Sequence, residues 1–135
     1  MNNMGCLFCK IRDGKVPANI IWENNRFIAF LDINPVNPGH VLLIPKKHIG
    51  YIFGLREPLY SEIFRIAKRL SAPIRKAMHA KRIGLAIEGF SVPHVHLHIV
   101  PLHQVNDLNP ERAKKATRKQ LSVVRDKIMR EMRNT

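Results

Sequence analysis

The stretch Val92-Pro-His94-Val-His96-Leu-His98-Ile-Val-Pro-Leu102 decides the fold and the chemistry of this 135-residue chain. Three histidines alternate with aliphatic residues, and successive side chains of a β-strand point to opposite faces of its sheet. We therefore expect a strand over residues 94–100, with His94, His96 and His98 on one face. That face suits nucleophilic catalysis, acid–base catalysis or metal binding. A histidine-rich surface strand and an adventitious metal patch are the alternatives that this stretch alone leaves open.

Hydrophobic patterning elsewhere in the chain predicts an α+β fold. Four more strands are expected over residues 20–22, 26–31, 40–44 and 83–88, with a short helical turn over 8–12. Apolar residues at helical spacing predict a long helix over 58–70 that continues toward residue 80. Within it, Pro73 either kinks the helix or begins a second one with Ser71 as its N-cap. The sheet is expected to have about five mostly antiparallel strands.

A basic helix is expected at the C-terminal end, over residues 109–133. Asn109, Pro110 and Glu111 supply an N-cap, a proline at the first helical position and an acid in the first turn. The whole chain has a net charge of +13, and residues 111–135 contribute nine Lys or Arg and three Asp or Glu. Such a charge attracts phosphate-bearing ligands, nucleotides or nucleic acid, although a basic surface without a specific partner has the same composition.

Length and composition predict a single domain over residues 1–135, with its core within 6–102. No apolar run approaches the roughly 20 residues of a membrane span. The first six residues lack the charged and apolar regions of a secretory signal, so we expect a cytoplasmic protein without membrane contact. Cys6 and Cys9 form a C-x-x-C pair, which is a metal half-site or a redox pair.

Together these residues resemble the histidine triad (HIT) family of nucleotide hydrolases and transferases. Residues 94–100 fit the signature His-φ-His-φ-His-φ-φ, where φ is apolar. Five other pieces occur in the family's order and spacing: Cys6-Leu-Phe-Cys-Lys-Ile, Gly14-Lys-Val-Pro-Ala, Phe30-Leu-Asp-Ile-Asn-Pro, Pro38-Gly-His and Leu43-Ile-Pro-Lys-Lys-His48. The resemblance runs from Cys6 to about Leu102 and leaves only the tail outside.

The resemblance implies that His96 attacks the α-phosphorus of a nucleotide ester, anhydride or phosphoramidate and forms a covalent nucleotidyl-histidine. His98 and His40 match positions that flank the phosphate, and Ser91 matches one that contacts the phosphate or leaving group. The nucleoside would be held by Asp32 at the ribose hydroxyls and by apolar residues around the base. These apolar residues are Phe8, Ile11, Val16, Phe30 and Ile33, and from sequence alone Phe30 and Ile33 fit a core equally well.

The resemblance also implies a structural zinc site and a homodimer. The zinc ligands would be Cys6, Cys9, His48 and His94, with a free cysteine pair as the alternative. His79 and His103 match no catalytic position and are expected at the surface. One departure is Ile87, which occupies a position where many members have Asn. The expected function is hydrolysis of adenylate derivatives, such as dinucleoside polyphosphates or phosphoramidates. The alternatives are nucleic-acid end deadenylation or binding, and zinc-stabilised nucleotide binding with little turnover.

Overall fold

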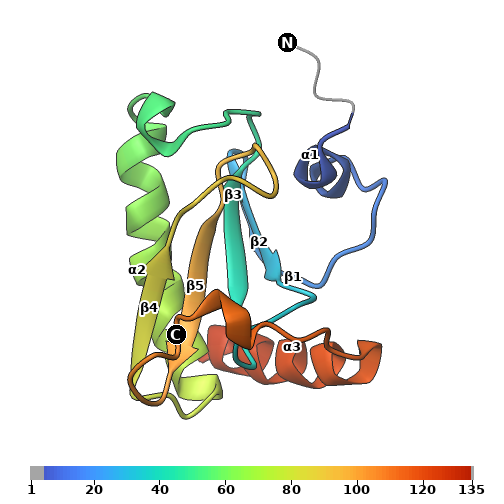
Figure 1. The fold of residues 1–135 in the computed structure, drawn as a ribbon, viewed down its shortest axis with the longest axis vertical. Coiled ribbons are helices and arrows are strands. Elements are labelled where there is room, and N and C mark those ends of the chain that lie inside the picture. Colours follow the sequence, from blue (N-terminus) through green and yellow to red (C-terminus); the bar gives the residue numbers. More distant parts are fainter. Residues whose placement is uncertain (1–4, 135) are drawn as a thin grey trace.

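A computed structural model of the chain describes residues 5–134. Its centre is a five-stranded antiparallel sheet in the order β1-β2-β3-β5-β4 (Figure 1). The strands are β1 (Ile20–Glu23), β2 (Phe27–Leu31), β3 (Val41–Pro45), β4 (Arg82–Ala86) and β5 (Leu97–Leu102). This arrangement of a sheet and helices confirms the predicted α+β class.

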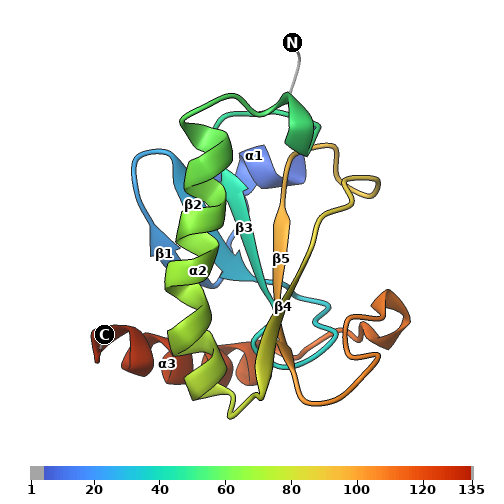
Figure 2. The same ribbon diagram turned by 90° about the vertical axis from the view of Figure 1, so that its left-hand side faces the viewer.

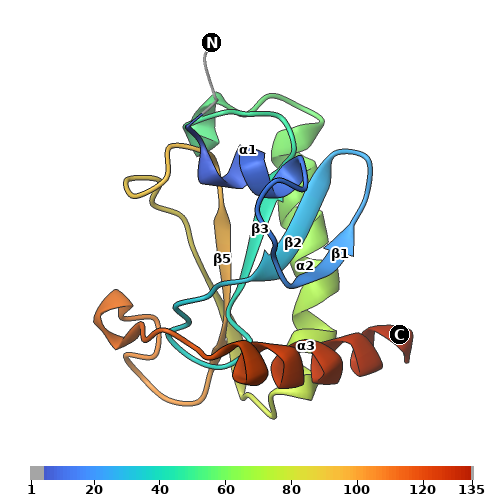
Figure 3. The same ribbon diagram turned by 90° about the vertical axis from the view of Figure 1, so that its right-hand side faces the viewer.

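Helices cover both faces of the sheet. The long helix α2 (Leu59–Ala77) lies over one face (Figure 2), and the short helix α1 (Leu7–Arg12) lies over the opposite face (Figure 3). The third helix, α3 (Arg118–Arg133), crosses one end of the sheet, and short 3-10 turns occur at Ile52–Gly54 and Pro110–Arg112. None of the helices in the described range is both long and apolar enough to cross a bilayer.

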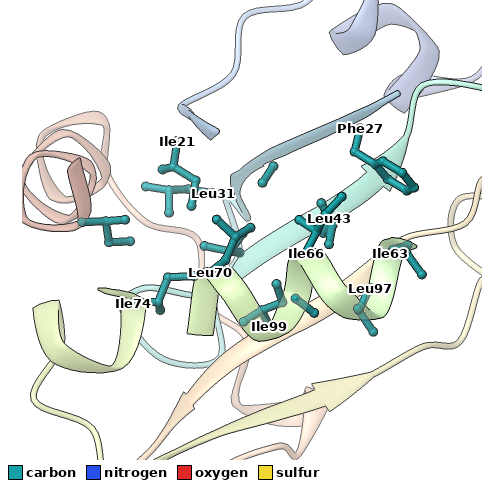
Figure 4. Packing of buried hydrophobic residues seen from close by; sticks show 14 of the residues in the cluster. Ile21, Phe27, Leu31, Leu43, Ile63, Ile66, Leu70, Ile74, Leu97 and Ile99 are labelled. Atoms are coloured by element: carbon teal, nitrogen blue, oxygen red, sulfur yellow. The ribbon is translucent and has the colours of Figure 1, made fainter. Parts of the chain in front are cut away.

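The main hydrophobic core lies between α2 and the sheet. From α2, Ile63, Leu70 and Ile74 pack in one cluster with Leu97 and Ile99 of β5, and all five side chains are fully buried (Figure 4). Burying a side chain of this size contributes about 1.5–3 kcal/mol. The apolar stripe of the long helix therefore covers the chain's own sheet, and the other face of the sheet is left to α1 and the candidate site.

Pro73 lies inside a single helix, so the alternative of a second helix beginning at Ser71 is wrong. Pro73 is buried, together with its neighbours Leu70, Ile74 and Ala77 on α2. The Ser71 hydroxyl donates to the carbonyl of Lys68, one turn earlier, instead of capping a new helix. Tertiary packing thus outweighs the cost of the missing backbone donor.

The C-terminal helix begins at Arg118, nine residues later than the sequence pattern indicates. Asn109 does cap the chain, but only for one 3-10 turn. The chain is then extended, because the N–H groups of Lys114 and Ala116 donate to carbonyls of the loop after β2, at 3.2 and 2.9 Å. A capping box between Thr117 and Gln120 starts α3.

Strand β5 also begins later than predicted, at Leu97, so that His94 and His96 precede it. The backbone N–H of Val95 donates a hydrogen bond to the carbonyl of Ile49, which lies in a loop and not in a neighbouring strand. The side chains nevertheless alternate as expected, since Val95 packs into the α2 cluster. The end of β4 at Ala86, before the expected residue 88, is a smaller difference of the same kind.

Candidate active site

A cavity of about 430 Å³ opens on the sheet face opposite α2. Its walls come from α1, from the loop after β2, from β5 and from the loop before it. The residues expected at the reacting phosphate and at the nucleoside all line this one cavity: Phe8, Ile11, Val16, Phe30, Asp32, Ile33, His40, Ser91, His96 and His98. The structure thus brings together ten residues that are spread over ninety positions of sequence.

The neutral form of the His96 imidazole has one defined tautomer. The ring is 4% exposed, and its Nδ1 lies 2.7 Å from the backbone carbonyl oxygen of His94. A carbonyl only accepts, so Nδ1 carries the hydrogen and donates it. Nε2 is then the unprotonated nitrogen, on a residue that lines the cavity. An imidazole in this state is a competent nucleophile.

His40 and His98 form a second hydrogen-bonded pair beside His96. The backbone N–H of Val36 donates to Nδ1 of His40 at 3.1 Å, so the hydrogen of His40 is on Nε2. His40 Nε2 lies 2.8 Å from Nδ1 of His98 and donates to it. The hydrogen of His98 must then be on its own Nε2, which leaves this N–H free to bind a phosphoryl oxygen. This chain of donors starts at the protein backbone and ends in the cavity.

Burial keeps both flanking histidines uncharged. It lowers the pKa of His40 to about 4, with the carboxylate of Asp32 acting in the opposite direction. Burial also lowers the pKa of His98, and the neighbouring His96 adds to this effect. At neutral pH the site therefore offers oriented N–H dipoles rather than imidazolium charges.

Asp32 is fixed at the start of the loop after β2. Its backbone N–H donates to the carbonyl of His40 at 2.9 Å, and Oδ1 accepts from the N–H of Asn34 at 2.8 Å. Its Oδ2 lies 3.5 Å from Nε2 of His40. The carboxylate is half-buried at the cavity wall, where it can accept hydrogen bonds from vicinal hydroxyls.

The apolar residues of the cavity differ in how they are placed. Phe8 and Phe30 are buried and meet edge to face with ring centroids 5.6 Å apart, and Phe8 also meets the ring of His96 at 4.9 Å. Ile33 is 53% exposed. Phe30 is thus both a core residue and a cavity wall, while the exposure of Ile33 argues against the core interpretation of that residue.

Sequence reasoning missed the part of the wall that the tail provides. The cavity is also lined by Leu108, Pro110 and Ala113, which lie beyond the part of the chain that matches the family's motifs. Glu88 also lines it, whereas its neighbour Ile87 packs into the α2 core on the other face. The position at which many family members have Asn therefore does not present its side chain to the cavity here.

A buried polar network joins the tail to the loop after β2. Asn37 donates from Nδ2 to the carbonyl of Pro101 at 2.8 Å and accepts from Arg112 at 2.6 Å. Arg112 also approaches Asp107 at 3.8 Å, and Asp107 accepts backbone N–H groups of the turn after β5. No local pattern predicts this network, because its members lie up to 75 positions apart.

The four residues expected to bind zinc form a separate cluster behind the cavity. Nδ1 of His94 lies 3.4 and 3.5 Å from the sulfurs of Cys6 and Cys9, and 3.2 Å from Nδ1 of His48. The sulfur of Cys9 lies 3.2 Å from the same His48 nitrogen. Both cysteines are free thiols. All four ligand atoms lie within 4.8 Å of one another.

This cluster fits a closed tetrahedral zinc site. His94 donates from Nε2 to the carbonyl of Pro45 at 2.8 Å, so its Nδ1 lone pair points into the cluster. Burial lowers the pKa of His94 to about 4, which keeps the ring neutral as a metal ligand must be. Two sulfurs and two imidazole nitrogens are a common structural zinc set. His79 and His103 are exposed and belong to neither cluster.

Comparison with known proteins assigns the chain to a family. A family model described as the HIT domain matches residues 13–105, so the chain belongs to the HIT family. It is 35% identical over 109 residues to protein hit of Bacillus subtilis, covering 76% of this chain and 74% of that protein. It is also 35% identical over 100 residues to adenosine 5'-monophosphoramidase hnt1 of Schizosaccharomyces pombe, covering 73% and 74%.

The fold is shared with solved structures of the same family. A zinc-bound histidine triad family protein from Mycobacterium smegmatis superimposes with a TM-score of 0.80 at 27% identity, covering 99% of this chain and 100% of that one. The predicted family membership and α+β fold are therefore confirmed. The family includes hydrolases that act on nucleotides, of which the fission yeast phosphoramidase is one.

Proposed function

We propose that this chain is a nucleotide hydrolase that cleaves adenylate derivatives at the α-phosphate through a covalent intermediate on His96. The observation that carries the proposal is the hydrogen bond from Nδ1 of His96 to the carbonyl of His94, because in the neutral ring it leaves the lone pair on Nε2 of a residue that lines the cavity. The similarity to a named adenosine 5'-monophosphoramidase supports the substrate class.

In the first step Nε2 of His96 attacks the α-phosphorus, and the bond to the leaving group breaks. The attacking ring becomes positively charged, and the carbonyl of His94 stabilises it through the Nδ1–H bond. His98, held by His40, donates from Nε2 to a phosphoryl oxygen and stabilises the negative charge there. Ser91, at the cavity wall, is placed to contact the phosphate or the leaving group.

In the second step water attacks the same phosphorus and breaks the N–P bond, so that the nucleoside monophosphate leaves and His96 is regenerated. Dividing one displacement into two lowers the barrier of each step. Asp32 holds the ribose hydroxyls, while Phe8, Ile11, Val16, Phe30 and Ile33 enclose the base. These contacts fix the α-phosphorus against His96.

Zinc has a structural role in this proposal. Cys6, Cys9, His48 and His94 would hold it, and the metal would join the N-terminal segment to the chain before β5. No residue of this set lines the cavity. His94, held among these ligands, would then keep its carbonyl in place to orient His96.

The test is AMP release from adenosine phosphoramidate and diadenosine tetraphosphate by the wild type, His96→Ala and His103→Ala. We expect the His96 variant to lose at least 1,000-fold in kcat, because the other two histidines that line the cavity, His40 and His98, present N–H groups from Nε2 rather than a lone pair, while the exposed His103 control keeps its rate. A nucleotidylated protein should be detected by mass spectrometry only when His96 is present. Unchanged turnover in His96→Ala would remove this residue as the nucleophile, and nucleotide binding without turnover in the wild type would favour a binding protein.

A further inference from the structure

A second cavity lies between the loop after β2 and the tail. Its volume is about 880 Å³, and it runs along the start of α3, which crosses the lower end of the molecule in Figure 3. The extended segment before α3 is tied to the loop by the bonds from Lys114 to Pro35 and from Ala116 to Ile33. We call this cavity the tail groove.

The tail groove is strongly cationic. Its lining includes five cationic residues, Arg112, Lys114, Lys115, Lys119 and Lys127, whereas Asp32 is the one carboxylate in it. Arg112 is occupied by Asn37 and Asp107. Within the described part of the chain the four lysines are exposed, and none has a carboxylate within ion-pair distance. Four ammonium groups around one groove attract a polyanion with regularly spaced charges.

The floor of the groove is apolar. Pro35, Pro38, Ala116 and Val123 line it, and Val123 is 45% exposed. Such a surface accommodates sugars and unpaired bases, whereas a lysine rim alone would suit any polyanion. Among the residues that line the groove there is no Phe, Tyr or Trp, so base stacking would contribute little to sequence preference.

The tail groove also adjoins the candidate active site. Leu31, Asp32, Val36 and His40 line both cavities, so only the thickness of this loop separates them. A nucleotide chain held in the groove would thus lie next to the residues that contact the ribose and the phosphate.

We propose that the tail groove binds single-stranded nucleic acid through its phosphates, independently of sequence. The four unpaired lysines contact the backbone, and the apolar floor receives the sugars and bases. This binding does not depend on the hydrolase activity, and it gives the basic tail a role that the nucleotide site does not require.

The experiment measures fluorescence anisotropy of a labelled 12-nucleotide oligouridylate over a series of NaCl concentrations. Four lysine contacts predict that log Kd rises with log salt with a slope of about 3 for a single strand. The groove variant replaces Lys114, Lys115, Lys119 and Lys127 by Ala. It should bind at least 10-fold more weakly at low salt, and its salt slope should fall toward zero.

A matched control removes the same charge from another surface. Arg65→Ala, Lys68→Ala, Arg69→Ala and Lys76→Ala lie on the exposed face of α2, across the sheet from the candidate active site. This variant should keep the affinity and the slope of the wild type within about twofold. Both variants should release AMP from adenosine phosphoramidate at the wild-type rate if that activity exists, and equal melting temperatures show independently that they fold.

Three results would overturn the proposal. Equal weakening in the groove variant and the α2 control would mean that net charge, rather than the groove, drives binding. A poly-glutamate peptide of the same charge that competes as well as the oligonucleotide would mean that the groove is a general polyanion surface. Stronger binding of a duplex than of the single strand would also contradict it.

Discussion

His94 belongs to both candidate sites. Its ring lies among the cysteines and His48, while its backbone carbonyl accepts the Nδ1 hydrogen of His96. Helix α1 also contributes to both sites through two adjacent residues: Phe8 lines the cavity, and Cys9 lies in the cysteine–histidine cluster. A change in this cluster should therefore disturb the position of His96 and the wall of the cavity at Phe8 together.

For the metal, we expect one zinc per chain in the wild type and none in Cys9→Ser, as measured by elemental analysis after gel filtration. The variant should melt at a lower temperature, because metal binding contributes directly to folding stability. His79→Asn changes an exposed histidine outside the cluster and should retain zinc. A Cys9 variant with full zinc content would show that these four residues are not the ligands.

Acid should destabilise the fold through His40. Its folded pKa of about 4 is below the unfolded value near 6.5, so the unfolded chain binds more protons between these values. The stability is thus complete above about pH 6.5 and is lost as the pH falls toward 4. In chemical denaturation, the wild type should lose about 2 kcal/mol more than His40→Gln between pH 7 and 4.5. His103→Gln, an exposed control, should follow the wild type, and equal losses in all three proteins would contradict the assignment to His40.

Many of the individual residues that line the candidate site were predictable from the sequence. The alternation of residues 94–100 predicted that His96 and His98 lie on the same face of a strand. The resemblance to the family's motifs predicted that Asp32 and His40 belong to the same site. The direction of the hydrogen bonds was not predictable, since it depends on the backbone N–H of Val36 and on the carbonyl of His94. Such groups carry no sequence signal.

Among the elements, the tail shows where local patterns mislead. Asn109 and Pro110 form a good helix start, yet the chain continues as extended backbone because the loop after β2 offers two carbonyls to it. Hydrogen bonds between distant segments cannot be predicted from a local pattern. The helix actually starts at a capping box formed by Thr117 and Gln120, which the sequence analysis did not identify.

The capping box gives a prediction for α3. Thr117→Ala removes the hydroxyl that accepts the N–H of Gln120 at 3.1 Å, at a cost of about 1 kcal/mol. We expect the melting temperature in calorimetry to fall by about 3–5 °C. Ser122→Ala, an exposed serine farther along α3, should leave it unchanged or raise it slightly. An unchanged melting temperature in Thr117→Ala would mean that α3 unfolds separately from the sheet.

For the whole molecule, the edge of the sheet at β4 is open. Leu85 on this strand is 45% exposed, and an open edge strand can pair with another chain. We propose that two chains associate there as a homodimer, and light scattering should then give twice 15.6 kDa. Leu85→Lys should shift the mass toward the monomer, whereas Val105→Lys, on a fully exposed turn, should not. A monomeric wild type at all concentrations would overturn the dimer.

The fold class and the set of strands and the long helix were predictable because these elements carry hydrophobic patterns of their own period, whereas the order of the strands in the sheet was not predicted. Pro73 was harder, since the cost of a proline in a helix is local while its compensation, burial in the folded protein, is a property of the whole fold. The tail groove could not be predicted at all, because its two walls are more than 70 positions apart in the sequence.

The hydrogen bond from the N–H of Ala116 to the carbonyl of Ile33 offers a way to detect ligand binding in the nucleoside cavity without attaching a probe to the ligand or the protein. Ile33 lines the nucleoside cavity, and its carbonyl holds a single amide of the tail. A nucleotide that orders Ile33 will therefore slow deuterium uptake at Ala116, although this amide belongs to a segment outside the family's motifs. Exchange mass spectrometry of one tail peptide would then serve as a binding assay, and it would detect ligands that are bound but never hydrolysed.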